Sequence, residues 1–361
     1  MTVPHSRTRL CRATALLAGI LVLSPAYSAR AFHDGGAAEC AACHVMHDAA
    51  DGEVLMDGSS PLLTAASASD VCLSCHEGAD GVMAANPLLP GLLRGAGDFV
   101  FLLEDNLNDA PDGLAAPIAG HAAGHSIVSM AYGLEPDPRW THAPGGNFPS
   151  SQLGCTSCHD PHGNSNFRML NGAGEIQGGA AVFVYDAPQA AGLDVTDPTA
   201  VETRNRHTAY IRGMSDWCAN CHGPYHDDGP APGVFRHGAD GTFPRGHANR
   251  YNAYEGTANP TGGLFTTAYL PEVPFEDPAA VVDRTNGPTA TSTLMCLTCH
   301  RAHASSAPAA LRWDMGTVDI STDGQVSGSY PLPNPYPGTG QERLCAKCHV
   351  AGVPGPDLHA D

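Results

Sequence analysis

The stretch Cys40-Ala41-Ala42-Cys43-His44 is the first of six Cys-x-x-Cys-His motifs in this chain of 361 residues. The other five motifs begin at Cys72, Cys155, Cys218, Cys296 and Cys345. The six motifs contain twelve of the thirteen cysteines, and the remaining one is Cys11. A spacing that recurs six times predicts that the thiols act in pairs, each pair with its adjacent histidine.

Two thiols separated by two residues can add to the two vinyl groups of one haem, and the next histidine can bind the iron. The motifs therefore predict six covalently bound haem c groups. The predicted attachment residues are Cys40, Cys43, Cys72, Cys75, Cys155, Cys158, Cys218, Cys221, Cys296, Cys299, Cys345 and Cys348. The predicted proximal iron ligands are His44, His76, His159, His222, His300 and His349. Zinc sites and redox dithiols also use Cys-x-x-Cys pairs, but neither needs a histidine after every second cysteine.

Residues 1–31 have the pattern of a secretory signal peptide. Arginines precede an apolar stretch from Ala13 to Leu23, and Ala29-Arg30-Ala31 is a small-x-small cleavage site. Cys11 would be removed with this segment. We expect residues 32–361 to form one hexahaem domain, with no later segment apolar enough to span a membrane. The sequence predicts a protein that crosses the periplasm and is secreted to the cell surface or beyond.

The composition leaves little material for a conventional hydrophobic core. Residues 32–361 provide 55 residues for each of six haems, and the chain contains 41 glycines, 30 prolines and only 6% aromatic residues. Such a composition is typical of irregular chains unless cofactors supply the buried surface. We expect a mostly irregular fold with few short helices and minimal β-structure, organised around six haems. Residues 182–185 are expected to form a short strand.

The chain is strongly acidic. Its formal net charge is -19, and removal of the four arginines in residues 1–31 changes this value to -23. Nucleic acids and anionic membrane surfaces are therefore poor partners for it.

The second axial ligand of each iron separates electron carriers from enzymes, because two histidines close the iron while an open position admits a substrate. Residues 32–361 contain twelve histidines outside the motifs, twice the number that six irons need. They are His33, His47, His121, His125, His142, His162, His207, His226, His237, His247, His303 and His359. All six irons can thus be closed by histidine.

Four of these histidines lie just after a motif. His47, His162 and His303 follow a motif histidine by three residues, and His226 follows one by four. A histidine so close in sequence cannot easily reach the far face of its own haem, so we expect it to bind the iron of a neighbouring haem. Met46 is an alternative ligand near the first motif, but the excess of histidines disfavours it.

Longer strings around the motifs resemble the extracellular hexahaem cytochrome filaments, or nanowires, of the outer-membrane cytochrome S type. The similar strings are Phe32-His33-Asp34-Gly35-Gly36, Glu39-Cys40-Ala41-Ala42-Cys43-His44-Val45-Met46-His47, Gly124-His125-Ser126-Ile127-Val128, Ala143-Pro144-Gly145-Gly146, Cys155-Thr156-Ser157-Cys158-His159-Asp160-Pro161-His162-Gly163, Trp217-Cys218-Ala219-Asn220-Cys221-His222, Arg236-His237 and Cys296-Leu297-Thr298-Cys299-His300-Arg301-Ala302-His303. The likeness extends from residue 32 to the sixth motif.

This resemblance implies a continuous chain of six bis-histidine haems in alternating parallel and T-shaped pairs. It also implies that subunits polymerise end to end outside the cell, and that His47 binds the fifth-motif haem of the adjacent subunit. Carried over by residue, the distal ligands are His33, His47, His125, His162, His226, His237 and His303, with His226 and His237 as alternatives for one place. The second motif has no close second histidine, so its distal ligand comes from elsewhere, with His125 as a candidate.

The expected function is long-range electron transfer to extracellular acceptors and redox partners by a polymer of this chain, without enzymatic activity. A monomeric periplasmic electron shuttle with the same haems is the first alternative. A multihaem oxidoreductase is the second, but such enzymes have an altered or open iron site, and here all six motifs keep their histidine.

Overall fold

The computed structural model describes residues 40–45, 49–50, 53–54, 62–78, 81–85, 95–104, 107–109, 116–176, 181–193, 202–226, 242–243, 245–253, 263–312 and 347–348. The proposed signal peptide and cleavage site therefore lie outside the described residues. So do His33, His47, His237, Cys345 and His349.

Short helices are the main regular elements in the described part of the chain. The α-helices are α1 (Cys40–Cys43), α2 (Ala68–His76), α3 (Cys155–Cys158), α4 (Met214–His226) and α5 (Arg245–Ala253). The 3-10 helices are η1 (Phe99–Leu103), η2 (Gly120–Ala122), η3 (Met130–Tyr132), η4 (Ser150–Gln152), η5 (Phe167–Met169), η6 (Phe265–Thr267), η7 (Cys296–Thr298) and η8 (Pro308–Ala310).

Four two-stranded antiparallel ribbons supply the β-structure among the described residues. They pair β1 (Ala49–Ala50) with β2 (Glu53–Val54), β3 (Leu107–Asp109) with β4 (Ala116–Ile118), β5 (Gly174–Glu175) with β6 (Val182–Phe183), and β7 (Gln189–Ala191) with β8 (Ala209–Arg212). The strand expected at residues 182–185 is confirmed at Val182 and Phe183 only, and the mostly irregular fold with little β-structure is confirmed.

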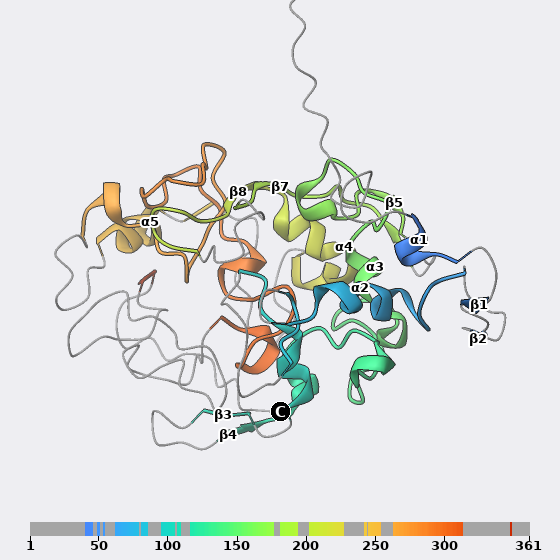
Figure 1. Cartoon of the computed structure of the whole chain (residues 1–361). Helices are drawn as coiled ribbons and strands as arrows, with labels where there is room; N and C mark the ends of the chain where they lie inside the picture. The colour runs from blue at the N-terminus through green and yellow to red at the C-terminus, as the bar shows by residue number, and fades with distance from the viewer. Residues whose placement is uncertain are drawn as a thin grey trace, which may run out of the picture.

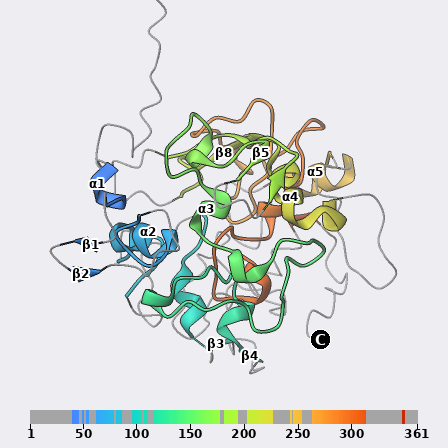
Figure 2. The same ribbon diagram turned by 90° about the vertical axis from the view of Figure 1, so that its right-hand side faces the viewer.

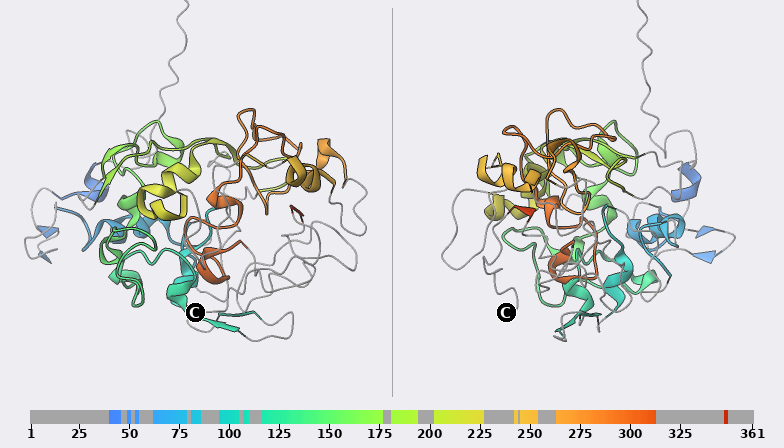
Figure 3. Two further views of the ribbon diagram at one scale, coloured as in Figure 1. Left: turned by 180° about the vertical axis from the view of Figure 1, so that it is seen from behind. Right: turned by 90° about the vertical axis from the view of Figure 1, so that its left-hand side faces the viewer.

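The motifs follow one another along the molecule. Figure 1 shows α1 and α5 at opposite ends, with α2, α3 and α4 between them. The reverse view in Figure 3 has the same order, and the side view in Figure 2 places α2 beside α3. Cys348 of the sixth motif packs against the buried cluster that contains Tyr251 of α5. The first and sixth motifs therefore lie toward opposite ends.

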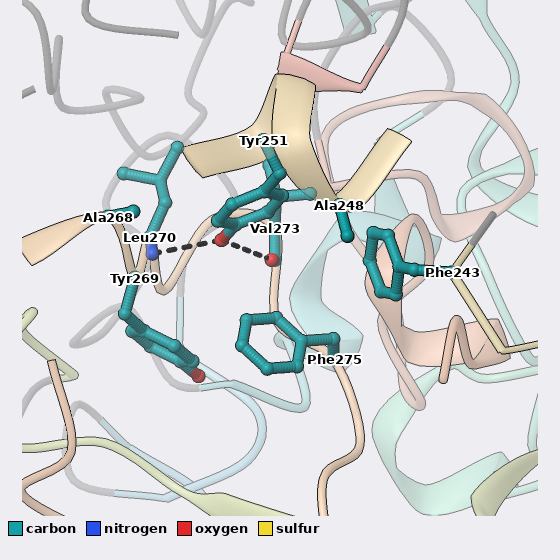
Figure 4. Close-up of a cluster of buried hydrophobic side chains, with 8 residues drawn as sticks. All are labelled: Phe243, Ala248, Tyr251, Ala268, Tyr269, Leu270, Val273 and Phe275. Atoms are coloured by element: carbon teal, nitrogen blue, oxygen red, sulfur yellow. Dashed lines mark hydrogen bonds between the residues drawn. The ribbon is translucent and has the colours of Figure 1, made fainter. Parts of the chain in front are cut away.

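Buried hydrophobic side chains form several small clusters instead of one core. The cluster in Figure 4 joins α5 to the segment after η6, and Cys299 and Cys348 pack against it. Within it, the Tyr251 hydroxyl donates to the Val273 carbonyl and accepts from the Leu270 N–H, each at 3.0 Å. Two other clusters pack against Cys155 and Cys221. Apolar packing is therefore divided among the motifs, as the composition predicts.

Candidate haem-binding sites

Each described motif is built on a helical turn. The odd-numbered motifs occupy the short helices α1, α3 and η7, while the second and fourth motifs occupy the longer helices α2 and α4. Residues three apart lie on one side of a helical turn, so the two thiols of a motif face the same way. All eleven described cysteines are free of disulfide bonds and are at least partly exposed. These thiol pairs fit the two attachment points of a haem.

The helices of the second and fourth motifs each have one distinctive feature, a capped start in α2 and a break in α4. In α2 the Ser67 hydroxyl accepts the Asp70 N–H at 3.1 Å, which satisfies a donor that the first helical turn leaves free. Helix α4 changes direction at His222, whose φ of -117° and ψ of 35° are not helical. Gly223 and Pro224 follow at once, and proline disfavours the helical conformation of the residue before it. The motif histidine thus lies where the helix geometry breaks.

The three odd-numbered motifs share one backbone pattern. In each, the motif histidine N–H donates to the carbonyl of the first cysteine, at 2.8 Å for His44, 3.0 Å for His159 and 3.1 Å for His300. A returning loop then pairs with the motif through isolated bridges from these histidines to Leu63, Leu170 and Leu311. In each of these motifs, the returning loop therefore fixes the backbone of the motif histidine.

Three motif histidines have a ring nitrogen fixed by a backbone carbonyl. The Nδ1 atoms of His159, His222 and His300 lie 2.9, 2.8 and 2.8 Å from the carbonyl oxygens of Arg168, Pro144 and Ala309. A carbonyl only accepts hydrogen bonds, so Nδ1 carries the proton and Nε2 keeps its lone pair. That tautomer presents Nε2 as the metal ligand in a fixed ring orientation.

Histidine rings meet in three pairs. The ring centres are 6.2 Å apart for His44 and His162, 6.4 Å for His159 and His303, and 5.9 Å for His222 and His125. Each pair joins a motif histidine to a predicted distal ligand. A metal between two imidazole nitrogens, with bonds of about 2 Å, separates the ring centres by about 6 Å. The pairs therefore have the spacing that one shared iron requires.

Desolvation favours the neutral form of several of these histidines. The surrounding protein desolvates His125, although the residue keeps solvent-exposed area, and this lowers its pKa to about 4. Burial likewise lowers the pKa of His303 to about 3 and lowers the pKa values of His159, His222 and His300. Iron binds the neutral imidazole, so these rings are in the form that ligation needs.

The ring pairs correct the expected partner of His125. The predicted ligands His33, His47 and His237 lie outside the described part of the chain. His125 lies against His222 of the fourth motif, not against the second motif, and its Nδ1 is 2.8 Å from the Ala302 carbonyl. Among the histidines outside the predicted set of ligands, His207 is buried with its ring nitrogens within 3.0 Å of backbone carbonyls, and His142 is exposed. The backbone of His226 ends α4.

The carbonyls of Arg168, Pro144 and Ala309 were not predicted as parts of the site. They act through backbone atoms, so the side-chain pattern carries no signal for them. Within the described residues, no group of three or more His, Cys, Asp and Glu side chains is arranged to hold a metal ion. The donor set fits haem c: paired thiols for attachment and paired imidazoles for iron.

In the described residues, no helix combines the length and the hydropathy that crossing a bilayer requires.

Comparisons with known proteins agree with this geometry. Residues 33–81 and 148–177 match the family described as "Doubled CXXCH motif". The chain is similar to the C-type cytochrome OmcS of Geobacter sulfurreducens, with 30% identity over an alignment of 430 residues that covers 92% of this chain and 96% of the relative. It also matches the solved Outer Membrane Cytochrome S filament of that organism, with a TM-score of 0.70 and 28% identity over 88% of this chain and 99% of the other. A second structure, of the OmcS nanowires, matches with a TM-score of 0.69 and the same identity and coverage.

Proposed function

This chain belongs to the OmcS family of c-type cytochromes, and from that premise we propose that it carries electrons outside the cell through six haems as an end-to-end polymer. The observation that carries the proposal is the set of three imidazole pairs with ring centres 5.9 to 6.4 Å apart. A haem iron held between two imidazoles changes between ferric and ferrous states without an open position for a substrate. The pairs therefore favour electron transfer over catalysis.

Two of the pairs follow one rule. His162, three residues after the third motif, faces the histidine of the first motif, and His303, three residues after the fifth, faces that of the third. Each odd-numbered motif thus supplies the distal ligand of the motif two places earlier. His47 stands three residues after the first motif. No motif precedes the first one in this chain, so the rule gives His47 no iron within its own subunit.

The rule extends naturally to a second copy of the chain. The motif two places before the first is then the fifth motif of the preceding subunit, whose histidine is His300. We infer that His47 binds that iron across the subunit boundary and so makes each join in the polymer. By elimination, His33 and one of His226 and His237 serve the second and sixth motifs.

The same proposal includes removal of residues 1–31 on export and a single haem-bearing domain of residues 32–361. The six haems are attached through the twelve motif cysteines. The partners are other copies of this chain and extracellular electron acceptors. The negative net charge of the chain disfavours binding to nucleic acids and anionic membranes, which would compete with these partners.

Substitution of one distal histidine tests the axial pairs. In His162→Ala the iron bound by His44 loses its second imidazole, so we expect one of the six ferric haems to become high-spin in electron paramagnetic resonance spectra. The matched control is His142→Ala, which removes an exposed histidine outside the pairs and keeps all haems low-spin. An unchanged low-spin spectrum of His162→Ala would contradict the pairing.

Substitution of His47 tests the polymer separately. We expect His47→Ala to be secreted with six haems but as discrete subunits, seen by electron microscopy and analytical ultracentrifugation. Filaments of normal length would refute ligation by His47 across the boundary. A wild-type protein that sediments as a monomer at all concentrations would instead favour the monomeric periplasmic shuttle.

A further inference from the structure

The second and third motifs form a unit that the fourth and fifth motifs repeat. The first unit comprises residues 69–76 and 154–171, and the second unit comprises residues 215–222 and 295–312. Helix α2 packs on α3 in the first unit, and α4 packs on η7 in the second. Each unit therefore joins a longer even-numbered motif helix to a single helical turn of an odd-numbered motif.

The odd-numbered halves of the two units match in backbone detail. The Asn171 N–H donates to the Cys158 carbonyl at 2.9 Å, and the Arg312 N–H donates to the Cys299 carbonyl at 2.7 Å. The carbonyls that fix the motif histidines belong to Arg168 and Ala309, which have φ values of 52° and 54°. Residues other than glycine seldom adopt positive φ, so its recurrence at equivalent positions indicates one shared local fold.

A serine from the even-numbered motif closes each unit. The Ser69 hydroxyl accepts the Cys155 N–H at 3.3 Å, and the Ser215 hydroxyl accepts the Cys296 N–H at 3.1 Å. Each serine stands three residues before the first cysteine of its own motif and binds the first cysteine of the next motif. The same contact thus links the two motifs of both units.

The contact has a clear physical reason. Cys155 and Cys296 begin their helical turns, where the first N–H groups have no partner within the helix. The preceding residues, Gly154 and Met295, have no side-chain hydroxyl or carboxylate that could cap the turn. Ser69 and Ser215 are only 4% and 0% exposed, so water does not readily replace their hydroxyls. The neighbouring motif therefore supplies the missing helix cap.

The attachment thiols meet beside this contact. The Cys72 and Cys155 side chains are neighbours in the first unit, and those of Cys218 and Cys296 are neighbours in the second. The first thiol of each motif is thus held against the first thiol of the next. Because each thiol holds one edge of a haem, fixing the two motifs fixes how the two attached groups lie relative to each other.

We propose that Ser69 and Ser215 are positioning residues that set the mutual orientation, and hence the electronic coupling, of the two haems in each unit. This proposal rests on the proposed function, because the coupled groups are the haems that these motifs attach. The hydroxyl of each serine bonds the backbone of a motif cysteine, which attaches the haem but is not a predicted iron ligand, so the spin state of the iron is expected to stay unchanged. Their loss is expected to change orientation without changing haem number.

The test compares serine variants of the full-length holoprotein by Soret circular dichroism, whose bisignate signal reports the orientation of neighbouring haems. Ser69→Ala and Ser215→Ala are each expected to lose part of this signal, and the double variant is expected to lose more than either. Ser69→Thr and Ser215→Thr, which keep a hydroxyl, are expected to retain it. The control is Ser305→Ala, since Ser305 is also buried but, among the described residues, the hydrogen bonds of its hydroxyl group join Ala307 and Leu311 of its own loop and not a motif cysteine.

An unchanged signal in both alanine variants overturns the proposal, and so does an equal loss in Ser305→Ala. If an alanine variant does not accumulate, the glycine variant of the same serine is measured instead. A partial loss of the Soret signal is again expected, and an unchanged signal again overturns the proposal. Failure of the proposed function is seen separately, as a wild-type protein without six low-spin haems by mass spectrometry and paramagnetic resonance.

Discussion

The two units have the same backbone but different surroundings. After the motif histidine the first unit has Asp160 where the second has Arg301, and at the end of the returning loop Asn171 stands where the second has Arg312. Both end residues donate to a carbonyl inside the motif: Asn171 to Thr156 at 3.1 Å and Arg312 to Leu297 at 2.6 Å. The shared backbone therefore positions the attachment residues, while side chains at equivalent places change the local charge.

The units are also joined to each other through histidine pairs. His303, from the second unit's returning loop, faces His159 of the first unit. His125, which lies outside both units, faces His222 of the second. Residues that would bind iron thus connect the second unit to the first unit and to the segment that contains His125. Breaking these pairs should have the largest effect on the molecule.

His303→Ala should be the most damaging single change. It removes the second imidazole facing His159 and the ring that stacks on Phe99 with centres 4.4 Å apart. We expect one high-spin haem and a clear fall in the thermal unfolding temperature, measured by paramagnetic resonance and calorimetry. His121→Ala is the control, because His121 lies outside the pairs. Six low-spin haems in His303→Ala would show that the second unit does not supply this ligand.

Replacing leucine at the same position of two motifs should lower the unfolding free energy by different amounts. Leu73 and Leu297 each follow the first cysteine of a motif, but Leu73 is 0% exposed inside its cluster and Leu297 is 8% exposed. We expect Leu73→Ala to cost about 3 kcal/mol of unfolding free energy and Leu297→Ala to cost less. Denaturant unfolding of both variants measures the difference. A larger cost at Leu297 would contradict the packing described.

A buried carboxyl makes the second unit's surroundings sensitive to pH. Burial raises the pKa of Glu272 to about 7 from 4.5, even though Arg312 and Arg301 act to lower it. Between these values the unfolded chain releases this proton while the folded chain keeps it, so stability falls as pH rises. We expect Glu272→Gln to gain on the order of 2 kcal/mol relative to wild type between pH 4.5 and pH 7. Parallel pH profiles for the two proteins would refute this.

Exchange of the end residues should shift haem potentials modestly. A buried positive charge favours the ferrous state, so Arg312→Asn should lower one midpoint potential by on the order of tens of millivolts. Asn171→Arg should raise one in return. Spectroelectrochemical titration measures both shifts, and exposed Arg139→Asn is the control. Shifts of the same sign in the two exchanged variants would show that charge at this position does not set the potential.

Much of the site follows from the sequence because covalent attachment needs fixed spacing. The motif cysteines and the histidines at 162 and 303 were predicted from position alone, and the structure places both of those histidines against motif histidines. His125 was named as a candidate ligand for the second motif, whereas the structure places it against His222 of the fourth motif. It lies far from any motif in sequence, so its partner depends on how η2 and the loop after η7 meet in space.

The unit itself was not predicted, although its signal is present. Ser69-Asp70 and Ser215-Asp216 occupy the same places before Cys72 and Cys218. A serine-aspartate pair before a helix is common at helix starts, so this repetition gains meaning only when the hydroxyl is seen on the next motif. The backbone carbonyls that hold the histidine rings have no counterpart in side-chain patterns at all.

A cryo-electron microscopy map of the secreted holoprotein at side-chain resolution tests the central claim most directly. The account predicts an iron between the rings of His44 and His162, His159 and His303, and His222 and His125, with His47 of one subunit facing His300 of the next. A map in which these rings bind other irons, or in which His47 turns back into its own subunit, would contradict the account.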